Sequence, residues 1–389
     1  MRKKKIVILG STGSIGTSTL EVLKKEKSNF CIELLTANNN YKKLIKQAKI
    51  FKPKNVLIKN STFKIIVEKN LIKEKIKVFS GDVSILNILK CKVDYTMSAI
   101  VGIAGLQPTL DAIKISRNVA LANKETIICG WELLAKQLKK YKTNILPVDS
   151  EHFSIMELTK GLKDKDLEEI IITASGGPLL NLSSDKLKKV KPAQAINHPT
   201  WKMGKKISVD SANLMNKVFE VIEANKIFNF KKNKYKVIIH PQSYVHSIIR
   251  FKSGLIKMLL HNTDMKIPIS NIIFGEKNHL TSIKNIDVDV LNNLSFQNVN
   301  RKKFPSLNLI EKCLKSGLLA PTILNASNEI LVDLFLSNKI KFTDIVENIN
   351  RIFRDKDFKK YARKNKMSLK NIKIADNWAR LKTTSLCVK

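Results

Sequence analysis

Asp149 and Glu151, one residue apart in the run Val148-Asp149-Ser150-Glu151-His152, could bind a hard metal ion. The run follows a predicted strand at 144–148, at the carboxyl end, where open α/β sheets place their ligands. If the chain turns there, both carboxylates face one cleft, and divalent cations prefer such oxygen ligands. The alternative is an ordinary helix start, because Asp and Ser are also common capping residues.

A second group of polar residues lies between Ser208 and Glu220. We predict a helix from about Ser211 to Lys226, on which four side chains share one face by their i, i+3 and i+4 spacing: Asn213, Asn216, Lys217 and Glu220. Amide and ammonium donors beside a carboxylate suit a phosphate and metal site. The alternative is an exposed ion pair between Lys217 and Glu220, although asparagines are poor helix formers on a purely solvated face.

A glycine turn, Gly10-Ser11-Thr12-Gly13-Ser14-Ile15-Gly16, directly follows the first predicted strand and opens a helix. Strand, turn and helix N-terminus together direct backbone N–H groups and the positive helix end at a pyrophosphate. The spacing is GxxGxxG and not the usual GxGxxG, so an ordinary glycine-rich turn is the alternative. The context of first strand and first helix favours a dinucleotide.

The end of the second predicted strand indicates which dinucleotide binds. NAD enzymes place an Asp or Glu there for the ribose 2′-hydroxyl. This chain has Thr36-Ala37 followed by Asn38, Asn39 and Asn40, with no carboxylate. Amide donors would meet a 2′-phosphate without repulsion, which favours NADP. No basic residue lies among these asparagines, but Lys42 and Lys43 follow closely.

The elements that must position these residues alternate between short β-branched runs and helical patterns over residues 1–149. This alternation predicts a Rossmann-like, doubly wound α/β sheet. The predicted strands are 5–9, 32–37, 55–58, 95–99, 119–122 and 144–148, and the predicted helices are 18–25, 41–51, 106–115 and 131–141.

The rest of the chain has a different pattern of predicted elements. Residues 150–275 read as an α+β catalytic domain with strands at 167–175, 235–240, 245–251 and 255–260 and a loop near 197–206. Residues 276–304 are polar and weakly periodic, which indicates a connector. Residues 305–389 predict a helical C-terminal domain, with helices at 306–316, 321–338 and 342–353.

Composition excludes several classes of protein. The 389 residues are 43% hydrophobic and 26% charged, as expected of a soluble globular protein, and no apolar run could span a bilayer. The net charge of +37 comes from 62 lysines and only eight arginines, dispersed along the chain. A nucleic-acid-binding protein would have more arginine, in clusters, so we attribute the net charge to a bias in amino-acid composition without a function. Five scattered cysteines predict neither disulfides nor a zinc site and fit the reducing cytoplasm.

Several longer motifs together resemble the 1-deoxy-D-xylulose 5-phosphate reductoisomerase family in order and spacing. They are GSTGSIG at 10–16, SAIVGIAGLQPT at 98–109, LANKE at 121–125, LPVDSEH at 146–152, TASGGP at 173–178, HPTWKMGKKISVDSANLMNK at 198–217, HPQS at 240–243, DMKIPI at 264–269, NASNE at 325–329 and FTDI at 342–345. These blocks cover nearly the whole chain.

The resemblance implies a specific reaction. The family converts 1-deoxy-D-xylulose 5-phosphate to 2-C-methyl-D-erythritol 4-phosphate in the non-mevalonate isoprenoid pathway. It uses NADPH and a divalent cation (Mg²⁺, Mn²⁺ or Co²⁺) and works as a cytoplasmic homodimer. A loop carrying Trp201 and Met203 resembles the family's flap over the active site. We expect no nucleic-acid or membrane partner.

The resemblance also implies residue roles. The metal would be held by Asp149, Glu151 and Glu220. The substrate would contact Lys124, Ser150, Glu151, Ser175, His198, Ser211, Asn216, Lys217 and Glu220. The cofactor would contact Thr12, Gly13, Ser14, Ile15, Asn123, Glu125 and Gly204, in addition to Asn38, Asn39 and Asn40. The catalytic set would be Lys124, Asp149, Glu151, His198 and Glu220, with His198 either a general acid/base or a residue that positions the phosphate.

Two alternatives remain at this point: a dehydrogenase without skeletal rearrangement, and a basic nucleic-acid-binding protein. The carboxylate set argues against the first, since simple reduction needs no chelation of adjacent oxygens. The chain also departs from the family. Asn38 and Asn39 stand where a glycine and a basic residue are usual, and His261-Asn262-Thr263 and Leu179 replace other residue types.

Overall fold

The protein is described by a computed structural model that covers residues 2–201, 203–275, 286–363 and 366–387. The chain divides into two compact units. The first comprises Met1–Thr126, Trp131–Phe153 and Asp264–Ser282, and the second comprises Ile127–Gly130, Ser154–Thr263 and Ile283–Lys389.

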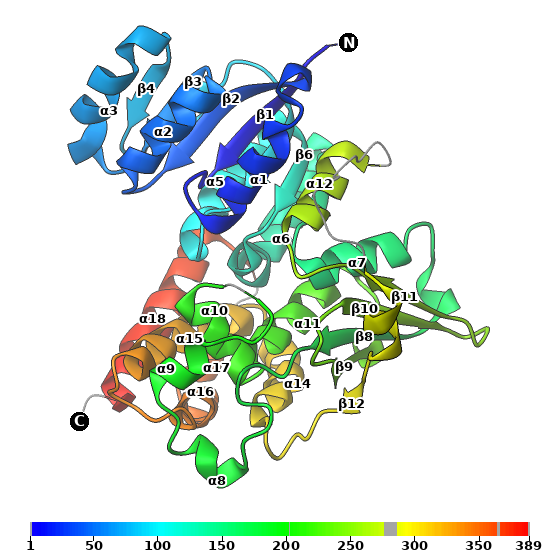
Figure 1. Ribbon diagram of the computed structural model, residues 1–389. Helices are drawn as coiled ribbons and strands as arrows, with labels where there is room; N and C mark the ends of the chain where they lie inside the picture. The colour runs from blue at the N-terminus through cyan, green and yellow to red at the C-terminus, as the bar shows by residue number, and fades with distance from the viewer. Residues whose placement is uncertain (1, 202, 276–285, 364–365, 388–389) are drawn as a thin grey trace. The chain divides into compact units, whose positions relative to one another are not determined.

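The first unit contains a seven-stranded sheet in the order β4-β3-β2-β1-β5-β6-β7 (Figure 1). Every neighbouring pair is parallel. The strands are β1 (Lys4–Leu9), β2 (Phe30–Ala37), β3 (Asn55–Ile58), β4 (Lys77–Ser80), β5 (Val93–Ser98), β6 (Ser116–Leu121) and β7 (Asn144–Pro147). The strand order reverses between β1 and β5, where doubly wound sheets bind their ligands. The predicted Rossmann-like sheet is confirmed.

Helices flank this sheet because its central strands are apolar on both faces. Val7, Ile8 and Leu9 of β1, for example, are completely buried. The helices of this unit are α1 (Ser14–Lys24), α2 (Tyr41–Phe51), α3 (Lys64–Leu71), α4 (Ile85–Ile88), α5 (Leu106–Ile115), α6 (Lys124–Tyr141) and α12 (Lys266–Phe274), and α7 (Ser150–Leu158) begins here. Helix α12 packs on α1, and Lys266 Nζ lies 2.8 Å from Glu21 Oε2.

Several elements in this unit differ from our predictions: α3 and α4 were not predicted, several strand ends are shifted, and the most informative differences are at β4, α1 and α6. Strand β4 escaped prediction because its four residues are only partly buried, apart from the exposed Lys77, and its alternation is weak. Helix α1 begins at Ser14, not residue 18. Helix α6 begins at Lys124, not residue 131, because Asn123 caps it and Ile127, Ile128 and Cys129 are all fully buried. A consecutive buried run has no amphipathic period to detect.

The second unit contains a five-stranded sheet in the order β11-β10-β8-β9-β12. Strands β8 and β9 are parallel, and the other pairs are antiparallel. The strands are β8 (Leu167–Ala174), β9 (Tyr235–Ile239), β10 (Val245–Phe251), β11 (Ile256–Leu260) and β12 (Gln297–Asn298). One core cluster joins Ile170 and Ile172 of β8 to Val221 of the helix that crosses them.

The helices of the second unit include the predicted helical C-terminal region. They are α8 (Ser184–Leu187), α9 (Pro192–Ile196), α10 (Lys205–Ala212), α11 (Met215–Phe228), α13 (Val288–Asn292), α14 (Asn308–Ser316), α15 (Ala320–Leu336), α16 (Asp344–Arg354), α17 (Phe358–Ala362) and α18 (Leu369–Cys387). The predicted α+β and helical regions are confirmed as fold classes. Our three-domain boundaries stay predictions, and residues 276–285 of the connector lie outside the described residues.

The predicted single helix over residues 211–226 is wrong. Two helices, α10 and α11, meet at Asn213 and Leu214. Leu214 has a φ of 59°, and Asn213 Oδ1 accepts a hydrogen bond from the backbone N–H of Met215 at 2.9 Å. The asparagine side chain thus competes with the helical ladder at that point. Asn213 therefore does not share a helix face with Asn216, Lys217 and Glu220.

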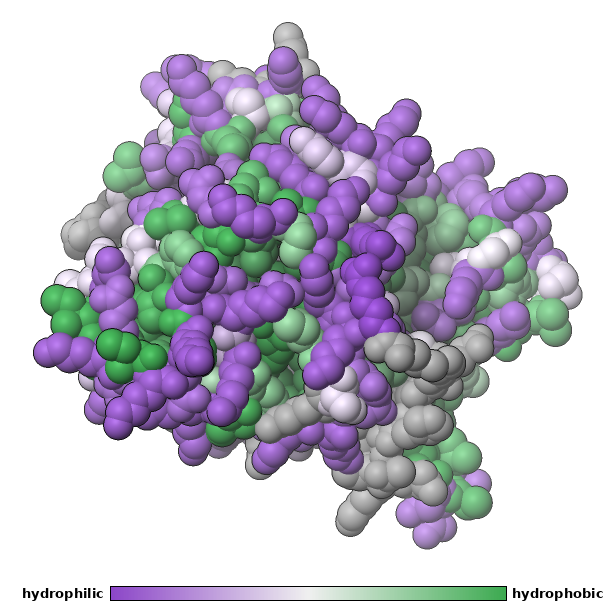
Figure 2. Space-filling view, turned by 90° about the horizontal axis from the view of Figure 1, so that it is seen from above, coloured by the Kyte–Doolittle hydropathy of each residue, from purple (hydrophilic) through white to green (hydrophobic). Residues whose placement is uncertain are grey.

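Hydrophilic side chains are spread over the face drawn in Figure 2, with smaller apolar groups between them. Among the described residues, no helix combines the length and the apolar character that a bilayer crossing needs.

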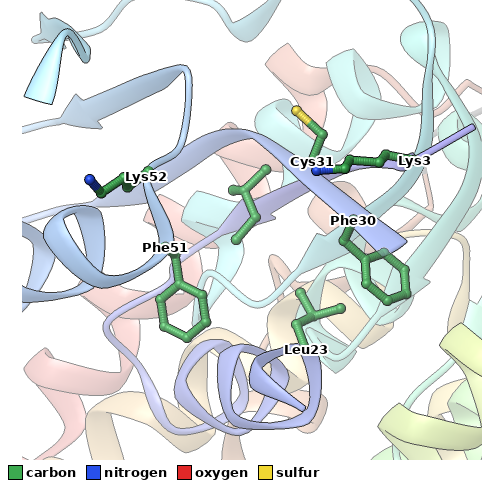
Figure 3. A pocket seen from close by; sticks show the side chains of 7 residues that line it. Lys3, Leu23, Phe30, Cys31, Phe51 and Lys52 are labelled. Atoms are coloured by element: carbon green, nitrogen blue, oxygen red, sulfur yellow. The ribbon is translucent and has the colours of Figure 1, made fainter. Parts of the chain in front are cut away.

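A cavity of about 260 Å³ lies in the first unit, lined by the apolar side chains of Leu23, Phe30 and Phe51 together with Lys3, Lys52 and Cys31 (Figure 3). These residues lie where β1 and β2 begin and where α1 and α2 end. The cavity is therefore at the amino edge of the sheet, opposite the edge at which parallel sheets bind nucleotides.

Candidate functional site

The glycine turn joins β1 to α1 and is held rigidly. Gly10 has a φ of +80°, and its N–H donates to Thr36 Oγ1 at 2.9 Å. A Cβ at Gly16 would collide with the carbonyl oxygen of Gly10 and the Cα of Ser11. The side chain of Gln47 fixes Ser11, accepting from its hydroxyl at 2.9 Å and donating to its carbonyl at 2.8 Å. The N-terminus of α1 begins immediately after this turn, with Gly13 as a cap that carries no side chain.

The end of β2 carries the three exposed asparagines. Asn40 caps α2, with Oδ1 accepting from the N–H of Lys43 at 3.1 Å. Asn39 Oδ1 accepts from Asn60 Nδ2 at 3.0 Å. No carboxylate lies on this loop, and this is the feature from which we predicted NADP.

The connection from β6 to α6 positions Asn123 and Lys124. The Asn123 amide donates to the carbonyl oxygens of Ile100 and Gly102, and its Oδ1 accepts from the N–H of Thr126 at 2.9 Å. This side chain therefore ties the ends of β5 and β6 together. The adjacent Lys124 extends to Asp149, with Nζ and Oδ2 3.0 Å apart.

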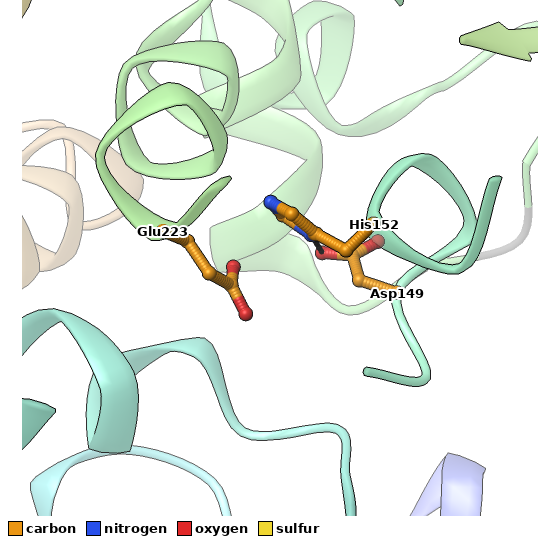
Figure 4. Close-up of side chains that lie close together, drawn as sticks. All are labelled: Asp149, His152 and Glu223. Atoms are coloured by element: carbon orange, nitrogen blue, oxygen red, sulfur yellow. Dashed lines mark ion pairs between the residues drawn. The ribbon is translucent and has the colours of Figure 1, made fainter. Parts of the chain in front are cut away.

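Strand β7 delivers the predicted carboxylates to the start of α7. Asp149 and Glu151 each offer an oxygen, and these oxygens lie within 4.8 Å of one another. Ser150 Oγ donates to Glu151 Oε2 at 2.7 Å. The fully buried His152, which we had not assigned a role, places Nδ1 4.0 Å from Asp149 Oδ2 (Figure 4). The predicted pair of carboxylates is thus close together within the first unit.

In the second unit, three separate segments meet around one imidazole. Ser175 follows β8, His198 lies on the loop after α9, and Ser211 lies on α10. His198 Nε2 is 2.9 Å from Ser175 Oγ and 3.1 Å from Ser211 Oγ. The N–H of Gly177 donates to Ser175 Oγ at 3.0 Å. These contacts bring together three residues that we predicted as substrate-binding, from positions up to 36 residues apart in the sequence.

The loop around His198 determines its tautomer. The backbone N–H groups of Thr200 and Trp201 donate to Nδ1 at 3.2 and 3.0 Å. Because Nδ1 accepts, the proton of the neutral ring resides on Nε2, which faces the two serines. Burial, followed by the nearby Lys217 ammonium, lowers the pKa of His198 to about 4. The ring is therefore neutral near pH 7 and presents an N–H donor.

Helix α11 adds charge to this group. Lys217 Nζ lies 2.7 Å from Glu220 Oε2, and the amide of Asn216 donates to Glu220 Oε1. The side chain of Glu220 is completely buried and that of Lys217 is 8% exposed. The alternative of an exposed surface ion pair is therefore wrong. We call Ser175, His198, Ser211 and Lys217 the phosphate cluster, after the ligand that the sequence predicts for them.

Residues that sequence reasoning missed support the loop after His198. Thr200 Oγ1 donates to Ser243 Oγ at 3.1 Å, and Thr263 Oγ1 donates to the carbonyl of Thr200 at 3.3 Å. The ring of His246 lies edge-on to Trp201, with centroids 6.1 Å apart. The HPQS motif at 240–243 was the available signal, but nothing in it indicates contact with residues 200–201.

The predicted cofactor residues mostly belong to the first unit. Thr12, Gly13, Ser14 and Ile15 lie on the glycine turn and the start of α1, Asn38, Asn39 and Asn40 after β2, and Asn123 and Glu125 at the start of α6. Gly204 caps α10 in the second unit. A doubly wound parallel sheet with a glycine turn after its first strand is the fold of nucleotide-dependent oxidoreductases.

Comparisons with known proteins agree. Family profiles for 1-deoxy-D-xylulose 5-phosphate reductoisomerase match residues 6–131, for its C-terminal domain residues 145–228, and for a further DXP reductoisomerase C-terminal domain residues 260–382. The reductoisomerase of Pelagibacter ubique is 46% identical over 99% of this chain and all of that protein. That of a Thermoanaerobacter species is 41% identical over 90% of this chain and 92% of its own.

Solved structures give the same result. The reductoisomerase from Zymomonas mobilis in complex with NADPH superimposes with a TM-score of 0.92 at 33% identity over both whole chains. A reductoisomerase in complex with NADPH, fosmidomycin and magnesium has a TM-score of 0.92 at 32% identity over 98% of each chain. The chain belongs to the 1-deoxy-D-xylulose 5-phosphate reductoisomerase family and is an NADP-dependent oxidoreductase.

Proposed function

We propose that this protein converts 1-deoxy-D-xylulose 5-phosphate to 2-C-methyl-D-erythritol 4-phosphate with NADPH and a divalent cation. The observation that carries the proposal is the phosphate cluster. Two serine hydroxyls, one imidazole N–H and one buried ammonium converge there. Such a set of donors matches a phosphate group, whose ionised oxygens accept hydrogen bonds and carry negative charge.

NADPH suits the first unit. The glycine turn directs the N-terminus of α1 at a pyrophosphate, and Gly16 lets that helix pack closely on the turn, because a Cβ there would collide with the Gly10 carbonyl. Relatives crystallised with NADPH support this cofactor. The residues we propose to contact it are those of the turn, Asn38 to Asn40, Asn123, Glu125 and Gly204. Because the amide of Asn123 is engaged with Ile100 and Gly102, we assign its contact to the backbone.

A divalent cation suits the carboxylates. We propose that Asp149 and Glu151 of the first unit and Glu220 of the second hold one ion. Asp149 and Glu220 each lie beside a lysine ammonium, Lys124 and Lys217, so a bound ion would share these carboxylates with the two lysines. A relative's complex with magnesium supports Mg²⁺, and Mn²⁺ and Co²⁺ are the other candidates. When bound, the ion would polarise the substrate carbonyl as a Lewis acid.

The chain's own residues would then orient the substrate. The phosphate cluster fixes the phosphate end, with Asn216 beside it. Lys124 and Ser150 lie next to the proposed metal ligands, where the reacting carbons would be. Neutral His198 donates through Nε2, so we assign it to positioning the phosphate and not to proton transfer. The loop with Trp201 would exclude water during the reaction. We further propose a homodimer that works in the cytoplasm within the non-mevalonate isoprenoid pathway.

The test follows absorbance of the reduced cofactor with purified protein, 1-deoxy-D-xylulose 5-phosphate, Mn²⁺ and NADPH. We expect oxidation of NADPH and a product with a branched carbon skeleton, identified by carbon NMR. A product reduced without rearrangement would instead identify a dehydrogenase on the same scaffold. Oxidation that persists without any divalent cation would contradict the metal assignment.

A further inference from the structure

The loop after β2 holds no basic residue among its asparagines, although the proposed cofactor carries a 2′-phosphate. Asn38, Asn39 and Asn40 are all exposed. Amides alone bind a dianion weakly compared with a charged donor. A cation from another part of the first unit would therefore be needed, and the sheet topology indicates which one. This inference rests on the proposed use of NADPH.

Strand β3 places a lysine directly beside the end of β2. The two strands are parallel, with Ala37 opposite Ile58. The N–H of Lys59 donates to the carbonyl of Ala37 at 2.9 Å, and the N–H of Asn60 donates to that of Asn38 at 3.2 Å. Lys59 therefore lies beside the end of β2. Dinucleotide-binding sheets contact the 2′ position of the ribose at this strand end.

The side chain of Asn39 is held in place by its neighbour Asn60. Asn39 Oδ1 already accepts from Asn60 Nδ2, at 3.0 Å. This bond orients the side chain and leaves its amide N–H₂ able to donate to a ligand. A donor pair suits a phosphate, which only accepts in its ionised form, better than it suits a hydroxyl.

The ammonium of Lys59 can change partners at little cost. Its Nζ pairs with Asp82 Oδ1, at 3.3 Å, beyond the end of β4. The side chains of Lys59 and Asp82 are 57% and 88% exposed, so water screens this pair and its contribution is small. A phosphate carries more charge than a carboxylate and would compete effectively for the same lysine.

Lys42 and Lys43 are the rival cations. They lie in the first turn of α2, beyond the cap residue Asn40, whereas Lys59 is hydrogen-bonded through its backbone to the end of β2 itself. We propose that Lys59, with the amide of Asn39, recognises the 2′-phosphate of NADPH. The cation that the family usually carries on the β2 loop is supplied here by the neighbouring strand.

The experiment is a calorimetric titration with two probes that differ only in the 2′-phosphate, adenosine 2′,5′-bisphosphate and adenosine 5′-monophosphate. Lys59→Ala removes a charge-assisted hydrogen bond and should therefore weaken binding of the bisphosphate by about tenfold. The affinity for the monophosphate should change by less than about twofold, because we expect its phosphate to bind at the glycine turn. Lys59→Arg should keep the bisphosphate preference, and Asp82→Asn, which removes the competing carboxylate, should strengthen it.

Lys77→Ala is the matched control, since Lys77 is an exposed lysine at the opposite edge of the sheet, where β4 begins. Unchanged bisphosphate affinity in Lys59→Ala, or the loss appearing instead in Lys42→Ala or Lys43→Ala, would overturn the assignment to Lys59. A wild-type protein that binds both probes equally would overturn the 2′-phosphate site as a whole, and with it the proposed NADPH preference. These two failures are distinguishable in one set of titrations.

Discussion

The two regions that we propose bind anions are built on opposite principles. The glycine turn of the first unit offers backbone N–H groups and a helix terminus, next to an exposed strand end. The phosphate cluster of the second unit uses side chains from four segments; Lys217 is buried and His198 is half-buried. A site made of backbone groups needs a tightly folded turn, so the residues that define it are glycines. A side-chain site needs compensated charge, so its determinants are partners such as Glu220.

The two sites should therefore be inactivated by different kinds of substitution. Glu220→Gln should lower kcat/KM by about a hundredfold or more at saturating Mg²⁺, because it removes a proposed metal ligand and the buried partner of Lys217. The matched control is Glu223→Gln, one turn further along α11 and also buried. Steady-state kinetics on both variants, with circular dichroism to confirm folding, are the measurement. Equal losses in the two would show that any buried carboxylate on α11 matters, and Glu220 would lose its special role.

In the backbone site the damaging change is an added methyl group. Gly16→Ala places a Cβ against the carbonyl of Gly10, which should destabilise the first unit by about 2–3 kcal/mol and abolish measurable NADPH binding. A Cβ at Gly13 would lie 3.4 Å from the same oxygen, so Gly13→Ala should be milder on both counts. Thermal unfolding and NADPH titration compare the two. If Gly16→Ala binds NADPH normally, the turn is not a backbone site.

Charge should matter locally in the buried cluster. Lys217→Ala should weaken substrate binding by more than about 1.4 kcal/mol, which is tenfold, because a charge-assisted contact to the phosphate is lost. The exposed lysines Lys64, Lys69 and Lys73 should have little effect when neutralised together, since exposed charges are screened beyond about 10 Å at ~0.1 M salt. Substrate affinities of both variants, measured without turnover, decide this. A comparable loss in the triple variant would mean that the overall charge of +37 attracts the substrate.

The smallest expected effect concerns pH. The pKa of His198 is about 4 in the folded protein, against 6.5 for an ordinary histidine. Between these values the unfolded chain binds a proton that the folded chain does not, so the free energy of unfolding rises with pH across this window. The stability is complete above pH 6.5 and decreases as the pH falls toward 4. His198→Gln should flatten this part of the profile, which denaturant titrations at several pH values would reveal. An unchanged slope would contradict the depressed pKa.

Much of the first unit could be predicted from local pattern. Strand β3 and helices α2 and α5 lie where the sequence pattern placed them. The two helices have an apolar face, and β3 is a short, mostly apolar run that is buried throughout. The glycine turn was recognisable because backbone approach restricts the residue type directly. By contrast, β4 and the start of α6 were missed, where burial follows the fold and leaves no period in the sequence.

The sequence by itself determined which side chains are available: the carboxylates of Asp149, Glu151 and Glu220, the glycines of the turn, and the absence of a carboxylate after β2. Only the tertiary structure decided how they act. Burial made Lys217 and Glu220 an internal pair, the break at Leu214 removed Asn213 from their helix face, and two backbone N–H groups set the tautomer of His198. The physical reason is that burial and long-range hydrogen bonds depend on neighbours distant in the chain, whereas residue chemistry and backbone freedom are local.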